Sequence, residues 1–239
     1  MRLIYFLFIL LAGSSSFAES LSTSLEIKQI DEYLFVHTSY KEVEGYGVVN
    51  SNGLIVLDGI QAFLIDTPWS TSDTEKLLAW LDGQGYELLA SISTHSHEDR
   101  TAGIDLLNAR LIPTYTSKLT NELLLHDGRP TATNTFDQID FSLGNGRIEV
   151  FYPGPGHTVD NLVVWLPEEN ILFGGCLVRS LEWSSLGYIG EASLNTWADS
   201  IRKIVNKYPD ITSIVPGHGE IGNTQILDHT IRLAEDAAK

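Results

Sequence analysis

Apolar runs of strand-like length alternate with polar turns along most of the chain. The first half opens with LEIKQIDEYLFVHTSY, GYGVV, GLIVLDG and QAFLIDTP, and the second half with RIEVFYPG, LVVWLP and NILFGGC. Runs of this length and composition predict β-strands. Asn52-Gly53 lies between two apolar runs, and because this dipeptide is a strong hairpin signal, we expect a hairpin turn there.

Helical patterns follow each group of strands. The segment EKLLAWLDGQG carries three leucines on one helical face, with a predicted capping box at Ser72 and Glu75 and predicted helix-ending glycines at Gly83 and Gly85. Further helices are expected over TAGIDLLNAR, SKLTNELLLHDG, LNTWADSIRKIVNKYP and TQILDHTIRLAEDAAK. Strands followed by helices, twice over, predict an α/β (α+β) fold in which two β-rich halves pack together with helices outside, an αβ/βα sandwich.

The first residues, MRLIYFLFILLAGSSSFAES, read as a leader. Arg2 precedes an apolar stretch that is too short to span a bilayer comfortably, and Ser16-Phe17-Ala18 supplies the small residues of a signal-peptidase site. We therefore expect residues 1–18 to be a cleaved signal peptide and residues 19–239 to form a single domain. No cysteine directly follows the cleavage site, so we expect export to a bacterial periplasm without a stable membrane anchor.

The charge balance limits the partners of the protein. The chain has 15 basic and 31 acidic residues and a net charge of −16. Nucleic acid or an anionic membrane surface would demand a basic patch, so neither is an expected partner. The sequence shows no sign of an oligomer interface, and we expect a monomer.

The chain has a single cysteine, Cys176. It cannot form an intramolecular disulfide, and a free thiol is a liability in an oxidising compartment. Two interpretations stay open at this point: a small buried hydrophobic side chain, or a thiolate bound to a metal.

Side chains of the kind that bind metals follow four of the apolar runs. They lie in STHSHEDRTAG, PGPGHTVDN, FGGC and PGHGE, and they are His95, His97, Asp99, His157, Cys176 and His218. Strand ends that share one sheet edge are where such folds place ligands. A lone His97 or His218 would more often be an ordinary polar residue, but six such residues placed in this way predict a metal site. The remaining histidines, His37, His126 and His229, lack this setting, and we interpret them as structural or surface residues.

The spacing favours two zinc ions. Residues i and i+2 of an extended segment point the same way, so His95 and His97 can share one ion, and His157 would complete a three-histidine catalytic site with an open position. A second ion would bind a set made up of Asp99, Cys176 and His218. Thiolate, imidazole and carboxylate together favour zinc over magnesium or calcium.

HSHEDRTAG, PGPGHTVDN, FGGCLVRS and PGHGEIG resemble the metal motifs of the class B metallo-β-lactamases, in their broad-spectrum di-zinc subclass. The resemblance extends over nearly all of the chain after the leader, including FLIDTPWS and SLNTW. The wider superfamily usually has a histidine after the motif aspartate and an aspartate in place of the cysteine. Arg100 and Cys176 therefore set this chain apart from the thioester hydrolases, lactonases and nucleases of the same fold.

The resemblance implies a four-layer αβ/βα sandwich and the two zinc sites given above. It also implies that a zinc-bound hydroxide hydrolyses the β-lactam amide bond of penicillins, cephalosporins and carbapenems, giving antibiotic resistance. Asp99 would act mainly as a ligand, with its oxygens helping to steer the proton. Arg100 and Asp66 would not bind zinc themselves but would orient the residues that do.

The resemblance also implies a set of residues that contact the β-lactam. Arg179 stands where many relatives have a lysine that pairs with the substrate carboxylate; otherwise it is a solvated surface arginine. Tyr46 would form the tip of a mobile hairpin and Trp69 the pocket floor, and each is otherwise a half-buried turn residue. Tyr188 replaces an asparagine that helps many relatives to bind the carbonyl oxygen. Its hydroxyl could donate there, or its ring could only stack, and with Trp183 it makes the rim aromatic.

Two other functions remain open. One is a thioester or lactone hydrolase on the same fold, against which Cys176 and Arg100 argue. The other is a non-catalytic zinc-binding protein, which would not need an open coordination position beside a second metal.

Overall fold

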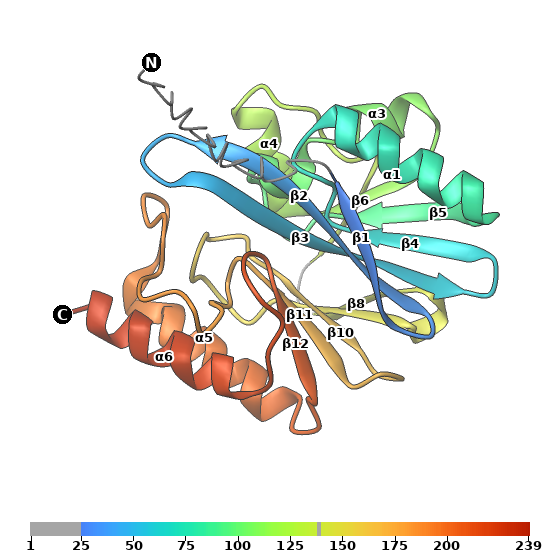
Figure 1. The fold of residues 1–239 in the computed structure, drawn as a ribbon. Helices are drawn as coiled ribbons and strands as arrows, with labels where there is room; N and C mark the ends of the chain where they lie inside the picture. Colours follow the sequence, from blue (N-terminus) through green and yellow to red (C-terminus); the bar gives the residue numbers. More distant parts are fainter. Residues whose placement is uncertain (1–24, 138–139) are drawn as a thin grey trace, which may run out of the picture.

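The computed structural model describes residues 25–137 and 140–239 (Figure 1). The predicted signal peptide, residues 1–18, lies outside this part of the chain. No helix in the described ranges is long and apolar enough to cross a membrane.

The first half of the chain forms a seven-stranded sheet whose strands lie in sequence order. They are β1 (Glu26–Asp31), β2 (Leu34–Val43), β3 (Gly47–Asp58), β4 (Gln61–Ile65), β5 (Glu87–Ile92), β6 (Thr114–Ser117) and β7 (Asn134–Phe136). The pairs from β1 to β4 are antiparallel, and those from β4 to β7 are parallel. Parallel pairs require crossover connections, and the helices of this half supply them.

The second half forms a five-stranded sheet in the order β12-β11-β10-β9-β8. These strands are β8 (Asp140–Leu143), β9 (Ile148–Phe151), β10 (Val163–Leu166), β11 (Ile171–Gly175) and β12 (Ser213–Pro216), and the 3-10 turn η1 (Gly144–Gly146) separates β8 from β9. Within this five-stranded sheet, β11 and β12 are the one parallel pair, and the crossover between them contains α5 (Leu194–Lys207).

Helices cover the outer face of each sheet (Figure 1). In the first half these helices are α1 (Thr71–Gln84), α3 (Ile104–Ala109) and α4 (Lys118–His126), and in the second half they are α5 and α6 (Gln225–Ala237). The short helix α2 (Glu98–Thr101) follows β5 at the edge of the first sheet. Leu77 of α1 and Leu107 of α3 pack on the first sheet, and Trp197 of α5 packs on the second. A third apolar core joins the inner faces of the two sheets, where Val56 and Val164 both lie. These four layers confirm the predicted αβ/βα sandwich.

The predicted hairpin turn at Asn52-Gly53 is wrong. Strand β3 continues through both residues, which pair with Thr38 and His37 of β2. A Cβ atom on Gly53 would lie 2.2 Å from Nε2 of His37, so this glycine allows a close packing contact instead of a turn. The β2–β3 turn lies at residues 44–46, with Tyr46 at the tip and left-handed glycines on either side at φ 81° and 75°.

The start of α1 also differs from the prediction. Its N-cap is Ser70, whose hydroxyl accepts a hydrogen bond of 3.0 Å from the backbone N–H of Asp73. The capping pair therefore lies two positions before the predicted Ser72 and Glu75, which are both inside the helix. Gly83 is also helical, and only Gly85, in the left-handed region at φ 80°, ends α1 as expected.

Candidate metal centre

The ends of four strands bring the predicted ligands to one edge of the sandwich. His95 and His97 follow β5, His157 follows β9, Cys176 comes directly after β11, and His218 follows β12. Asp99 lies in the first turn of the short helix α2. The sequence pattern predicts a helix only from Thr101 onward, whereas α2 begins three residues earlier and turns the carboxylate toward the other ligands.

The three histidines of the first set converge on a common space. Their ligand nitrogens lie within 4.8 Å of one another, and Nε2 of His157 lies 3.1 Å from Nδ1 of His97. His95 is 1% exposed, yet its Nε2 has no hydrogen-bond partner among the described residues. Burial holds the pKa values of His95 and His157 well below the usual value, which favours the neutral imidazoles that bind metals.

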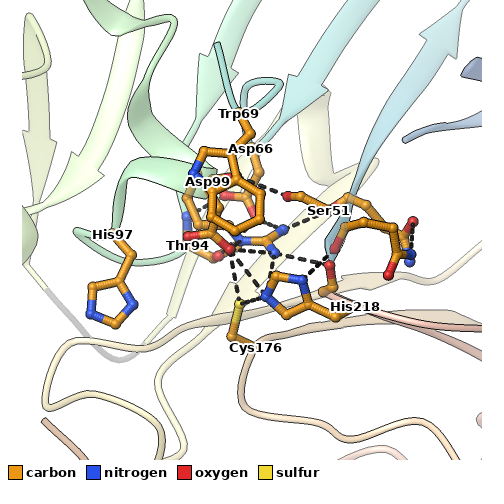
Figure 2. A network of polar contacts seen from close by, with 12 residues as sticks. Ser51, Asp66, Trp69, Thr94, His97, Asp99, Cys176 and His218 are labelled. Carbon is orange, nitrogen blue, oxygen red and sulfur yellow. Dashed lines mark hydrogen bonds and ion pairs between the residues drawn. The ribbon is translucent and has the colours of Figure 1, made fainter. Parts of the chain in front are cut away.

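The second set is equally close (Figure 2). Sγ of Cys176 lies 3.4 Å from Oδ2 of Asp99 and 3.2 Å from Nε2 of His218, and the last two atoms are 3.2 Å apart. The ligand atoms of His95, Asp99 and Cys176 also lie within 4.8 Å of one another, so the two sets adjoin. The structure therefore brings together all six predicted ligands.

Arg100 supplies the positive charge behind this set. Its Nη2 lies 2.8 Å from Oδ2 of Asp99, and its Nη1 lies 3.3 Å from Oδ2 of Asp66. Burial would raise the pKa of Asp99, but Arg100 and His218 outweigh it and hold that pKa well below its usual value. Burial raises the pKa of the Cys176 thiol, against a smaller opposing effect of Arg100. A bound metal would supply the charge that stabilises the thiolate.

The donor set fits zinc. A buried imidazole nitrogen without a partner, and a thiol, a carboxylate and an imidazole within 3.4 Å of one another, are groups that a zinc ion would satisfy. Close approach of these groups without an ion would leave buried polar atoms unsatisfied at a cost in free energy.

Asp66 lies behind the site, as the resemblance implies. It follows β4 in a left-handed conformation at φ 59°. Its carboxylate accepts hydrogen bonds from the N–H and hydroxyl of Thr94, at 2.7 and 2.9 Å, and contacts Arg100. Asp66 therefore orients the segment that begins at Thr94 and carries His95.

A cleft of about 470 Å³ opens above the two ligand sets. Its lining includes five residues that the resemblance associates with substrate, Tyr46, Trp69, Arg179, Trp183 and Tyr188. Arg179 is only 7% exposed, so it is not a solvated surface arginine. Tyr46 and Tyr188 are 56% and 50% exposed at the rim, whereas the Trp69 ring lies 6.0 Å from the ring of His218.

Three residues near the ligands were not identified from the sequence. Nε2 of His97 lies 3.2 Å from Oε2 of Glu191, and Oδ2 of Asp160 accepts a hydrogen bond of 2.9 Å from the Ser96 N–H. Arg129 donates to the Ser96 carbonyl. Asp160 belongs to the motif PGPGHTVDN and could have been found there. Glu191 and Arg129 lie in loops with no distinguishing pattern.

The remaining histidines lie outside the two ligand sets. His37 is 1% exposed, and its Nε2 donates to the Asp66 carbonyl at 3.0 Å, whereas His126 is exposed on α4. His229 of α6 donates from Nε2 to the Trp183 carbonyl at 2.8 Å.

Sequence comparisons with known proteins all point to one family. Residues 46–218 match the sequence profile described as the metallo-beta-lactamase superfamily. A metallo-beta-lactamase type 2 of Pseudomonas aeruginosa is 48% identical over 206 residues, covering 86% of this chain and 82% of the relative. One from Bacteroides fragilis is 35% identical over 215 residues, covering 89% of this chain and 86% of the relative.

Solved structures agree with these relatives. The structure of TMB-1 has a TM-score of 0.89 and 55% identity, covering 90% of this chain and 99% of the other. The crystal structure of the metallo-beta-lactamase DIM-1 exposed to ceftazidime has a TM-score of 0.89 and 51% identity, covering 90% of this chain and 98% of the other.

Proposed function

The chain belongs to the metallo-beta-lactamase superfamily, and from this premise we propose that it hydrolyses the β-lactam amide bond of penicillins, cephalosporins and carbapenems, giving antibiotic resistance. The observation that carries the proposal is the pair of adjoining ligand sets beneath one cleft. The cofactor is Zn²⁺, and we propose two ions per chain.

We assign the first ion to His95, His97 and His157, and the second to Asp99, Cys176 and His218. When bound, zinc supplies Lewis-acid chemistry: it polarises a carbonyl and lowers the pKa of water to about 7. The protein's own side chains then bind the β-lactam, orient it and handle the proton.

Arg179 binds the substrate carboxylate in this proposal. Its buried guanidinium lines the cleft, and its Nε has no hydrogen-bond partner among the described residues. Burial lowers the pKa of Arg179, yet a guanidinium stays protonated at neutral pH. A planar guanidinium can bind a carboxylate through two parallel hydrogen bonds, which fixes the orientation of the β-lactam ring.

Asp99 handles the proton in this proposal. Both of its contacts with Arg100 use Oδ2, so we assign proton transfer to Oδ1. The low pKa of Asp99 keeps its carboxylate ionised, so Oδ1 can accept a hydrogen bond and steer a proton toward the leaving nitrogen.

The cleft rim shapes the substrate-binding space. Tyr46 and Trp69 line one part of the cleft, and Trp183 and Tyr188 line another. The Tyr188 ring lies 6.0 Å from that of His97, edge to face, which places it close to the first ligand set. We propose that this aromatic rim packs against the substituents of the β-lactam.

The location and assembly of the protein also belong to this proposal. We propose that residues 1–18 direct export to the periplasm and that residues 19–239 act there as a monomeric single domain. Recovery of the protein in the periplasmic fraction, with an intact mass that matches a chain starting at Glu19, would support export. A full-length protein in the cytoplasmic fraction would contradict it.

Parallel assays test the substrate class. We expect the purified protein to hydrolyse one penicillin, one cephalosporin and one carbapenem, with little turnover of a thioester or a lactone. Faster turnover of the thioester or lactone would favour a hydrolase of the other class. Zinc binding without any turnover would identify a non-catalytic zinc-binding protein.

A further inference from the structure

The segment from Arg179 to Trp183 forms a short loop on the wall of the cleft. Both end residues line the cleft, and the Arg179 guanidinium lies 5.1 Å from the centre of the Trp183 ring. Within the loop, the Trp183 N–H donates to the Ser180 carbonyl at 3.2 Å. A shift of the loop would therefore move both the Arg179 backbone and the Trp183 ring against which the guanidinium packs.

Two consecutive residues of α6 contact the two ends of this loop. Thr230 is 0% exposed, and its hydroxyl accepts a hydrogen bond of 2.9 Å from the Arg179 N–H. The same hydroxyl donates to the Ile226 carbonyl at 2.7 Å, which fixes its orientation within the helix. His229 donates from Nε2 to the Trp183 carbonyl at 2.8 Å.

The other side of the loop packs against Gly219, next to the predicted ligand His218. A Cβ atom added to Gly219 would lie 2.4 Å from Oε1 of Glu182 and 2.7 Å from Nε1 of Trp183. The loop is therefore held between α6 and the segment that carries His218, and it has little room to shift.

We propose that His229 and Thr230 are positioning residues that hold the Arg179–Trp183 loop so that the Arg179 guanidinium faces the substrate carboxylate. This inference rests on the proposed function of Arg179. It makes the C-terminal helix, which lies on the outer layer of the sandwich (Figure 1), part of the substrate-binding apparatus. A guanidinium held in place loses less conformational entropy when the carboxylate binds.

The first test replaces Thr230. Thr230→Val keeps the shape but removes the acceptor for the Arg179 N–H, and we expect KM for a carboxylate-bearing β-lactam to rise about fivefold to tenfold. We expect kcat to change less than about twofold, because Arg179 anchors the substrate and does not react. Thr230→Ser keeps the hydroxyl and should restore a near-normal KM.

A double-mutant cycle separates positioning from general damage. In an Arg179→Ala background, Thr230→Val should raise KM no further, because its effect passes through Arg179. His229→Leu should raise KM, and His229→Gln, which keeps a side-chain donor, should recover part of the loss. As a control, Arg232→Ala changes an exposed residue of α6 and should leave both KM and kcat unchanged.

Hydrogen exchange gives a readout that does not depend on activity. We expect the backbone amides of residues 179–183 to exchange faster in the zinc-loaded Thr230→Val protein than in the Thr230→Ser protein. Unchanged exchange, a fall in kcat at constant KM, or an equal rise in KM in the Arg179→Ala background would each overturn the inference. Absence of β-lactam turnover in the unsubstituted protein would contradict the proposed function instead, and exchange alone would then decide whether α6 holds the loop.

Discussion

Arg100 and Asp99 are consecutive in the chain and form a buried ion pair, with Nη2 of Arg100 2.8 Å from Oδ2 of Asp99. Arg100 is 0% exposed and also donates to the carbonyls of Asn52 and Gly217, at 2.5 and 2.9 Å. One guanidinium thus connects α2, β3 and the segment before His218. It balances the charge that the second ligand set concentrates there.

Replacing Arg100 should destabilise the fold. In Arg100→Met the carboxylates of Asp66 and Asp99 lose their buried partner, and we expect the free energy of unfolding to fall by about 3 to 5 kcal/mol. Urea unfolding measures this change. Arg100→Lys keeps the positive charge but cannot contact several acceptors at once as the guanidinium does, so we expect a smaller fall in the free energy of unfolding than in Arg100→Met. A loss below about 1 kcal/mol in Arg100→Met, the range of exposed ion pairs, would contradict the assigned role.

Arg179 should matter for binding more than for turnover. We expect Arg179→Ala to raise KM for a β-lactam at least about tenfold while kcat falls less, because a buried charge-assisted contact to the carboxylate is lost. Arg179→Lys, which keeps the charge, should recover part of the affinity. Steady-state kinetics at constant zinc concentration decide the point. A large fall in kcat at unchanged KM would refute the anchoring role.

His37 should make stability depend on pH. Burial lowers the pKa of His37 to about 4 in the folded protein, while an unfolded histidine titrates near pH 6.5. Between these values the unfolded state binds more protons, so the His37 contribution is lost as pH falls from about 6.5 to about 4. The full shift corresponds to about 3 kcal/mol.

Comparison with His37→Gln isolates this contribution. Asp66 titrates in the opposite sense, since burial raises its pKa to about 6, but that effect is common to both proteins. Urea unfolding between pH 4 and 7 should show His37→Gln gaining stability, relative to the unsubstituted protein, as the pH falls. A constant difference across this range would mean that His37 is not buried in its neutral form.

Cys176 should hold the second zinc ion. We expect native mass measurements on Cys176→Ala to show one zinc per chain, because the set then keeps only Asp99 and His218. Cys176→Asp offers an oxygen ligand at the same position, and we expect a larger fraction of its chains to hold two zinc ions than in Cys176→Ala. Unchanged zinc content in Cys176→Ala would contradict the assignment.

The sequence predicted that the six candidate ligands would lie together, because each of them follows an apolar run. Strand ends are visible in the sequence, and a parallel or mixed sheet brings the ends of its strands to a common edge, so His157 and His218 of the second sheet could be related from the order of the strands. That His95 of the first sheet joins them depends on how the two sheets pack. The buried face of α1, which includes Leu77, was also visible in the sequence, because its apolar residues recur with helical periodicity.

What the sequence did not predict depends on tertiary contacts. Asn52-Gly53 has the local preference for a turn, but His37 packs against the space that a side chain on Gly53 would need. Glu191 contacts His97 across 94 residues of chain, and Arg129 contacts Ser96 across 33. No local pattern marks such pairs, because they arise only when distant segments of the chain pack together.

We propose that adjoining zinc sites under one cleft carry out β-lactam hydrolysis. The most direct measurement is carbapenem hydrolysis by the purified protein before and after chelation, with bound zinc counted by native mass spectrometry. We predict turnover with two zinc ions per chain, loss of turnover on chelation, and recovery when zinc is returned. A protein that holds two zinc ions without hydrolysing any β-lactam, or that keeps its activity after zinc is removed, would rule out zinc-dependent β-lactam hydrolysis at this site.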